Sequence, residues 1–242
     1  MQFWALTDPG CVRTQNQDAY HLEQLDKNTL LCAVCDGMGG AKSGNVASSL
    51  AVDVFIQEVK RSWKPDMDDE QVDQMLQSAV KLANFTVYDQ AQQFQEFSGM
   101  GTTLVAVMIR GKRITVVNVG DSRAYYVNKQ GIRQITQDHS LVQMMIAKGE
   151  LSQEQAKNYP GKNLITRAIG TETTVTCDIF HKKVSKGDYF LLCSDGLSNL
   201  MDDQEILFEV AHGQDKDKCC QRLLDIAKKR GAPDNVTSVL VA

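Results

Sequence analysis

The sequence has little that would place the protein in a membrane or on nucleic acid. No segment approaches the ~18 apolar residues that a membrane span needs. The first ten residues, MQFWALTDPG, lack the basic start and apolar core of a signal peptide. The net charge is −4 and no basic block is present, which argues against a protein that binds nucleic acid phosphates. We therefore expect a cytoplasmic protein with no membrane contact and no nucleic acid partner.

Proline and regularly spaced cysteine are also scarce. Only four prolines occur and no Pro/Ser-rich linker divides the chain, so residues 1–242 are expected to form a single domain. The seven cysteines are an odd number without regular spacing, which favours reduced thiols over a disulfide framework. Cys32 and Cys35 lie in a strand-like run, where residues three apart point to opposite faces. This placement argues against a zinc or redox site.

The apolar pattern predicts blocks of short strands separated by pairs of helices. Strands are predicted near residues 2–7, 18–24, 30–35, 102–109, 113–119, 123–127, 131–135, 175–184, 188–193 and 236–241. Helices are predicted near residues 43–61, 69–95, 203–211 and 216–230, with Ser43 as the N-cap of the first. This order indicates antiparallel sheets covered by helices, rather than a parallel βαβ sheet.

Four aspartates stand at the ends of strand-like runs. They are Asp36 after LLCAVC, Asp121 after RITVVNVG, Asp195 after YFLLCS and Asp234 before NVTSVLVA. Alone, each could be an ordinary turn residue. If the ends converge, charges ~4 Å apart repel by about 4 kcal/mol per pair at an effective dielectric near 20, so the cluster would need cations. Oxygen ligands favour Mg²⁺ and Mn²⁺, and two such ions can activate a water and hold a phosphoryl group.

Spacing cannot show that these ends meet, but a resemblance implies it. The runs RTQNQD, VCDGMGG, GMGTTLVAV, VNVGDSRAYYV, LLCSDGLSN and APDNVTSVLV resemble, in order and spacing, the motifs of the protein phosphatase 2C family. The resemblance covers essentially the whole chain. It implies a metal-dependent phosphatase that hydrolyses phosphoserine and phosphothreonine monoesters by attack of a metal-bridging water or hydroxide. It also implies an α+β fold, with two antiparallel β-sheets in a central sandwich flanked by helix pairs, in four layers.

The resemblance further assigns roles to individual residues. Asp36 would bridge both catalytic metals, Gly37 would give its backbone carbonyl to one of them, and Asp195 and Asp234 would hold the other. Asp18 would sit beside the pair, mostly through metal-bound waters. Asp36, Asp195 and Asp234 are thus the expected catalytic residues, acting through metal-activated water.

A third metal and a phosphate-binding residue are implied in the same way. Bacterial members hold a third, weaker ion with aspartates that correspond to Asp121 and Asp195. The expected cofactors are therefore two tightly bound Mn²⁺ or Mg²⁺ ions and a third weaker one. Arg13 would bind the substrate phosphate, a role that suits the forked donors of a guanidinium. Without the family, Arg13 would be read as an exposed loop arginine.

Two residues depart from the family pattern. Met38 stands where many eukaryotic members carry a histidine that is a proposed general acid. A metal-bound water is the simplest substitute for that acid here. Gln17 stands where other members often have glutamate, which leaves a water-mediated metal contact from that position open.

Residues 138–171, called the flap segment below, match the mobile flap of bacterial members. Substrate recognition is expected there, because loops carry specificity. Thr102 and Thr103 are expected to be structural, at the tight entry to a strand. None of the four histidines has ligand spacing, and His139 is the one that merits a test.

Competing chemistries lack their residues. No cysteine is followed by arginine in a C-x₅-R pattern, no G-x-S-x-G is present, and a His-rich ligand set is missing. Two alternatives stay open: a catalytically silent member that binds phosphoproteins or metals, and a phosphomonoesterase of small molecules. A catalytically silent member would be expected to lack one of the metal aspartates, and none is missing here. Phosphorylated proteins, a Ser/Thr kinase and its substrates are the expected partners of a free-standing, monomeric enzyme.

Overall fold

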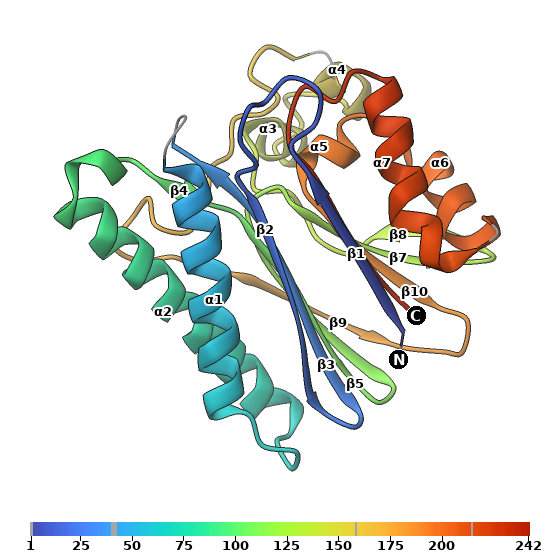
Figure 1. Ribbon diagram of the computed structural model, residues 1–242, viewed down its shortest axis with the longest axis horizontal. Helices are drawn as coiled ribbons and strands as arrows, with labels where there is room; N and C mark the ends of the chain where they lie inside the picture. Colours follow the sequence, from blue (N-terminus) through green and yellow to red (C-terminus); the bar gives the residue numbers. More distant parts are fainter. Residues whose placement is uncertain (1, 40–42, 158, 214) are drawn as a thin grey trace.

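Two antiparallel β-sheets pack face to face at the centre of the computed structural model (Figure 1). The structure describes residues 2–39, 43–157, 159–213 and 215–242, so residue 40 of the VCDGMGG motif and residue 158 of the flap segment lie outside it. The first sheet has the order β1 (Phe3–Asp8), β11 (Val236–Val241), β10 (Tyr189–Cys193), β7 (Arg123–Asn128) and β8 (Gly131–Gln134). The second has the order β2 (Asp18–Asp26), β3 (Thr29–Met38), β5 (Leu104–Arg110), β6 (Arg113–Val119) and β9 (Asp178–Lys183), and the short β4 (Gly101–Thr102) pairs with β3.

Helices cover the outer face of each sheet. The long helices α1 (Gly44–Ser62) and α2 (Asp69–Gln93) pack on the second sheet, at the left of Figure 1. The helices α5 (Asp195–Ser198), α6 (Asp203–Leu207) and α7 (Cys219–Lys229) pack on the first sheet. Two short helices, α3 (Leu141–Ala147) and α4 (Gln153–Lys157), belong to the flap segment. The predicted sandwich of two sheets flanked by helices is confirmed.

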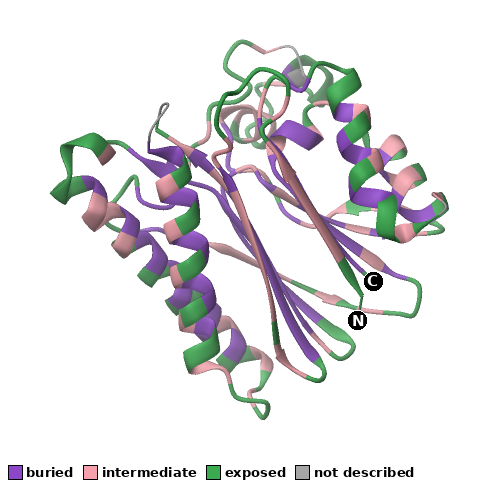
Figure 2. Cartoon of the chain, in the orientation of Figure 1, coloured by how far each residue is buried: buried purple, intermediate pink, exposed green. Residues whose placement is uncertain are grey.

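Strand β3 shows why the central strands are apolar at nearly every position. Alternate residues of a strand point to opposite faces. Leu30 and Cys32 pack between the two sheets, whereas Leu31 and Cys35 pack toward α1 and α2. Both faces are therefore buried, as the purple central strands of Figure 2 show. Cys32 and Cys35 lie on opposite faces as predicted, and all seven cysteines are free thiols. Among the described residues, no helix is long and apolar enough to span a membrane.

The predicted elements differ from the observed ones at a few ends. The strand predicted over residues 102–109 is interrupted at Thr103, whose backbone N–H donates to the carbonyl of Asp36 at 2.9 Å. The strand predicted from residue 175 begins at residue 178, because the carbonyl of Thr176 accepts from Arg167 instead of pairing with β6. Ser43 is the N-cap residue of α1, but its hydroxyl donates to the carbonyl of Gly39 and does not cap the helix.

Candidate active site

Aspartates from both sheets meet at one end of the sandwich. Asp18 and Asp36 are directly paired residues of the neighbouring strands β2 and β3. Asp195 follows β10 and Asp234 precedes β11, and these two strands are neighbours in the other sheet. Asp121 lies in the turn between β6 and β7. The structure thus brings together all five aspartates that the family resemblance assigned to metals.

The carboxylates are close enough to raise one another's pKa. Burial, followed by the charges of Asp18 and Asp195, raises the pKa of Asp36 well above its usual range. The pKa of Asp121 rises to about 7, mainly through burial and then through Asp195 and Asp138. Several negative charges therefore share one partly buried region, and a nearby cation would stabilise their ionised forms.

The environment of the Asp18 carboxyl indicates that a cation binds at this site. Its Oδ2 accepts hydrogen bonds from the hydroxyls of Ser194 at 2.7 Å and Thr237 at 2.6 Å. Its Oδ1 is buried without a hydrogen-bond partner among the described residues. Burial raises the pKa of this carboxyl to about 6. A cation or one of its waters would satisfy the orphaned oxygen, so the residues present fit a metal site.

The protein side chains alone do not form a closed ligand cage. In the described parts of the chain, no group of three or more Asp, Glu, His or Cys side chains has the geometry to hold a metal ion. Any ion here would have to complete its coordination with backbone oxygens and water, which Mg²⁺ readily keeps. The expected carbonyl ligand, Gly37, would supply one such backbone oxygen. It is a buried residue at the end of β3, and its N–H donates to the carbonyl of Gln17 at 3.1 Å.

Close backbone contact holds Asp195 and Asp234 in neighbouring positions. Gly196 packs so tightly on the next segment that a Cβ there would lie 1.9 Å from the carbonyl oxygen of Asn235. Only glycine allows this approach. The residue after each aspartate, Gly196 and Asn235, therefore makes the contact that joins the two acidic loops.

Arg13 lies at the edge of the aspartate cluster. Its Nη2 donates to Asp234 Oδ2 at 3.0 Å, and about half of its side chain is exposed. Asn235 holds the loop that carries it: the side-chain oxygen accepts from the N–H of Gln17, and the side-chain nitrogen donates to the carbonyls of Pro9 and Gln15. Asn235 was missed from sequence. Its only signal was its place directly after Asp234.

Thr102 and Thr103 hold the backbone of Asp36. The hydroxyl of Thr102 donates to the Asp36 carbonyl at 2.8 Å, and the N–H of Asp36 donates to Thr103 Oγ1 at 2.9 Å. Thr103 Oγ1 also contacts Ser122 Oγ at 2.7 Å, next to Asp121. These residues serve the structure as expected, and they link the backbone of Asp36 to the turn that carries Asp121.

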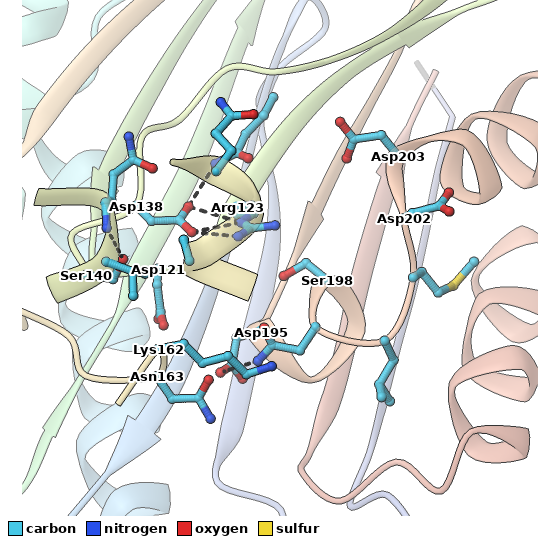
Figure 3. Close-up of a pocket in the computed structure, with 18 of the residues that line it drawn as sticks. Asp121, Arg123, Asp138, Ser140, Lys162, Asn163, Asp195, Ser198, Asp202 and Asp203 are labelled. Carbon is cyan, nitrogen blue, oxygen red and sulfur yellow. Dashed lines mark hydrogen bonds and ion pairs between the residues drawn. The ribbon is translucent and has the colours of Figure 1, made fainter. Parts of the chain in front are cut away.

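A cavity of about 820 Å³ extends away from Asp121 and Asp195 (Figure 3). The flap segment lines one side of it, through residues such as Val142 and Lys162. Asp202 and Asp203 lie at the end remote from Asp121. Its wall is mostly polar, which suits an extended, hydrated ligand better than a compact apolar one. A second cavity, of about 450 Å³, lies beside Met38 under residues 165–176.

The chain is similar to known proteins over nearly its whole length. The family model "Protein phosphatase 2C" matches residues 12–240. The serine/threonine phosphatase stp of Listeria monocytogenes is 34% identical over 97% of this chain and 93% of its own length. The serine/threonine protein phosphatase PstP of Mycobacterium tuberculosis is also 34% identical, over 99% of this chain but only 44% of its own length.

Solved structures agree in fold as well. The crystal structure of the serine/threonine phosphatase Stp1 from Staphylococcus aureus superposes with a TM-score of 0.94 and 36% identity, covering 100% of this chain and 94% of that one. The Mycobacterium tuberculosis phosphatase PstP/Ppp superposes with a TM-score of 0.86 and 33% identity, over 99% and 97% of the two chains. The chain therefore belongs to the protein phosphatase 2C family, among the bacterial serine/threonine phosphatases of that type.

Proposed function

We propose that the protein removes phosphate from phosphoserine and phosphothreonine in proteins, with two Mn²⁺ or Mg²⁺ ions held by Asp36, Gly37, Asp195 and Asp234. The observation that carries this proposal is the buried cluster of mutually repelling carboxylates, with one oxygen of Asp18 that has no hydrogen-bond partner in the described parts of the chain. When bound, the ions would neutralise these charges, activate a water and withdraw charge from the phosphoryl oxygens.

The chain's own residues would supply positioning and binding. Asp36, with its backbone held by Thr102 and Thr103, would keep one carboxylate fixed between the two sheets. Asp18 would accept hydrogen bonds from water in the site through Oδ1, which none of the residues that the structure describes contacts by a hydrogen bond. Arg13, half exposed beside Asp234, would bind the phosphate with its forked donors.

Asp121 and Asp195 would hold a third, weaker ion. Burial and the charge of Asp195 raise the pKa of Asp121 to about 7, so a cation between these two carboxylates would lower their mutual repulsion. The flap segment beside them would contact the phosphoprotein through the long polar cavity. A phosphorylated Ser/Thr kinase and its targets are the proposed substrates, handled in the cytoplasm by residues 1–242 acting as one monomeric catalytic domain.

A metal-dependence assay tests the proposal. A phosphothreonine peptide and a sugar phosphate would be offered at equal concentration with Mn²⁺, with Mg²⁺ or with a chelator. We expect fast, metal-dependent hydrolysis of the peptide and slow hydrolysis of the sugar phosphate. Faster turnover of the sugar phosphate would favour a small-molecule phosphatase. Full activity in the chelator would exclude the metal mechanism, and metal binding without hydrolysis of either compound would indicate a silent family member.

A further inference from the structure

His139 contacts the turn that carries Asp121 through both its ring and its backbone, and Asn118 Nδ2 also donates to the carbonyl of Gly120 at 3.2 Å. Gly120, directly before Asp121, has φ +106°, and a Cβ there would lie 2.6 Å from the Thr103 side chain. Its N–H donates to His139 Nδ1 at 3.0 Å, and its carbonyl accepts from the backbone N–H of His139 at 2.9 Å. His139 thus satisfies both backbone groups of Gly120.

The contacts of His139 fix its tautomer. Because Nδ1 accepts from the Gly120 N–H, the ring proton of the neutral imidazole must be on Nε2. Nε2 lies 3.2 Å from Asp178 Oδ2, which can accept that proton's hydrogen bond. Arg167 Nη1 also lies 3.0 Å from Nε2, but both groups are donors, so its hydrogen bond goes to Asp178 Oδ1 at 2.9 Å.

Burial favours the neutral form of the imidazole. His139 is 8% exposed. Desolvation lowers the pKa of its ring, although Asp178 opposes the shift. A protonated ring would also carry a hydrogen on Nδ1 and could not accept from Gly120.

The same residue closes the base of the flap segment. The carbonyl of His139 accepts from the N–H of Thr166 at 2.7 Å, and the N–H of Leu141 donates to the carbonyl of Leu164 at 2.8 Å. The two ends of the flap segment therefore lie side by side at His139. Arg167, next to Thr166, belongs to the ion pair with Asp178 on β9. His139 thus contacts the base of the flap segment through its backbone carbonyl, and Asp178 on β9 and the Asp121 turn through its ring.

We propose that His139 is a positioning residue, which fixes the Gly120–Asp121 turn to the base of the flap segment and so aims the Asp121 carboxylate toward Asp195. The inference rests on the proposed function for its catalytic consequence. It does not require His139 to touch metal or substrate. The essential contact is the acceptor that Nδ1 offers to the Gly120 N–H.

Two amide substitutions separate this contact from general packing. In His139→Asn the side-chain oxygen sits as many bonds from Cβ as Nδ1 does, so it can accept from Gly120. In His139→Gln the oxygen is one bond further out and misses this position. His139→Ala removes the acceptor entirely. The control is His181→Ala, which removes a half-exposed histidine on β9 whose Nε2 lies 3.1 Å from Asp73 Oδ2.

The readouts are Mn²⁺ titration by calorimetry, kcat and KM on a phosphothreonine peptide, and thermal unfolding. In His139→Ala and His139→Gln we expect the weak-site affinity and kcat to fall by ~10-fold to 100-fold, as when a partner of a metal ligand is lost. The tight metal pair and KM should change little, and His139→Asn and His181→Ala should resemble the wild type. Equal behaviour of the folded Asn and Gln variants would overturn the proposal, as would unchanged weak-site binding in His139→Ala. Should the Ala variant not fold, the Asn and Gln pair decides.

A second measurement does not depend on metal or activity. ¹⁵N NMR of the metal-free wild type should find Nδ1 of His139 unprotonated, Nε2 protonated, and the Gly120 amide shifted by hydrogen bonding. The opposite tautomer would also overturn the proposal. A wild type that binds no Mn²⁺ and hydrolyses no phosphopeptide would instead refute the proposed function, while the NMR result would still test the role of His139.

Discussion

Two buried polar residues, Asn235 and His139, each hold a loop on one side of the aspartate cluster, and they do so differently. Asn235 ties the Arg13 loop through three hydrogen bonds to backbone groups, at Pro9, Gln15 and Gln17. His139 holds the Asp121 turn through backbone groups as well, but its ring also contacts the charged pair of Arg167 and Asp178.

The aspartate cluster therefore has a fixed side, held by Asn235, and an adjustable side, held by His139. The bonds of Asn235 are all to main-chain groups close to β1, β2 and β11, so the Arg13 loop is part of the folded frame. The partners of His139 include Thr166 and Arg167, near the end of the flap segment. A shift of that segment would therefore change the contacts of His139. We expect substitutions on the Asn235 side to cost stability, and those on the Asp121 side to cost turnover.

Removal of Asp36 should have the largest effect, because its carboxylate is proposed to contact both catalytic ions. Asp36→Ala removes the one carboxylate proposed to contact both catalytic ions, so activity with Mn²⁺ should be lost. Calorimetry should find the tight metal pair gone, while circular dichroism of the metal-free protein stays that of the wild type. Turnover near the wild-type rate in the folded variant would contradict the binuclear assignment.

Asp121→Asn tests the adjustable side alone. The amide has the same shape, so the turn and the tight metal pair should persist while the weak site is lost. If that site assists the leaving group, kcat should fall by ~10²-fold to 10⁴-fold, as for lost general acid-base assistance. A wild-type kcat with one fewer bound ion would make the third ion catalytically idle. Loss of the tight pair would place Asp121 among its ligands.

Asn235→Ala tests the fixed side. Asn235 is 4% exposed. The substitution removes the side-chain partner of two backbone carbonyls and one backbone N–H. We expect the free energy of unfolding to fall by about 2–4 kcal/mol, and hydrogen exchange to increase at residues 9–17.

Asn84→Ala is the matched control for this substitution. Asn84 is a buried asparagine that ties Gly170 and Glu172. Its loss should cost a similar amount of stability and leave exchange at residues 9–17 unchanged. Equal exchange in the two variants would show that Asn235 does not specifically hold the Arg13 loop.

The stability of the metal-free protein should depend on pH through Asp121, on the adjustable side. Asp121 has a folded-state pKa raised to about 7 from an ordinary 3.8. The folded state therefore binds this proton more tightly, so stability is greatest at low pH and is lost as pH rises through 7. Between pH 5 and 7 the loss from this group should be about 2 kcal/mol. Asp121→Asn should flatten that slope in chemical denaturation, and an unchanged slope would mean that Asp121 is not crowded by its neighbours.

Arg13→Ala should give the smallest effect. The side chain is half exposed, so its loss should hardly change stability. A charge-assisted phosphate contact made equally in ground and transition states mainly sets KM. We expect KM for the phosphopeptide to rise by about 10-fold, with kcat and metal affinity unchanged. An unchanged KM together with weaker metal binding would assign Arg13 to the carboxylates rather than to the phosphate.

The sequence predicted most of the strands and the aspartates at their ends, because apolar runs and ordered motifs are local signals, whereas the meeting of those ends was implied by the family resemblance. It was insufficient for Asn235 and for the role of His139. Their partners lie up to 226 residues away along the chain, and a single Asn or His carries no mark of which backbone groups it will meet. The break at Thr103 was missed for a similar reason, since its N–H and hydroxyl both serve Asp36, 67 residues away.

The pairing of β1 with β11 has a consequence for how the protein becomes active. The first and last strands are neighbours (Figure 1), and the N–H of Gln2 donates to the carbonyl of Ala242 at 3.0 Å. Thr237 supplies a hydrogen bond to Asp18, and Asp234 pairs with Arg13. During synthesis, Asp18 and Arg13 emerge from the ribosome long before these partners exist. A nascent chain therefore carries its acidic loops without a finished centre, and such long-range closure is slow to form. Phosphatase activity should begin only after residue 237 has left the ribosome, so that translation itself delays the enzyme's first turnover.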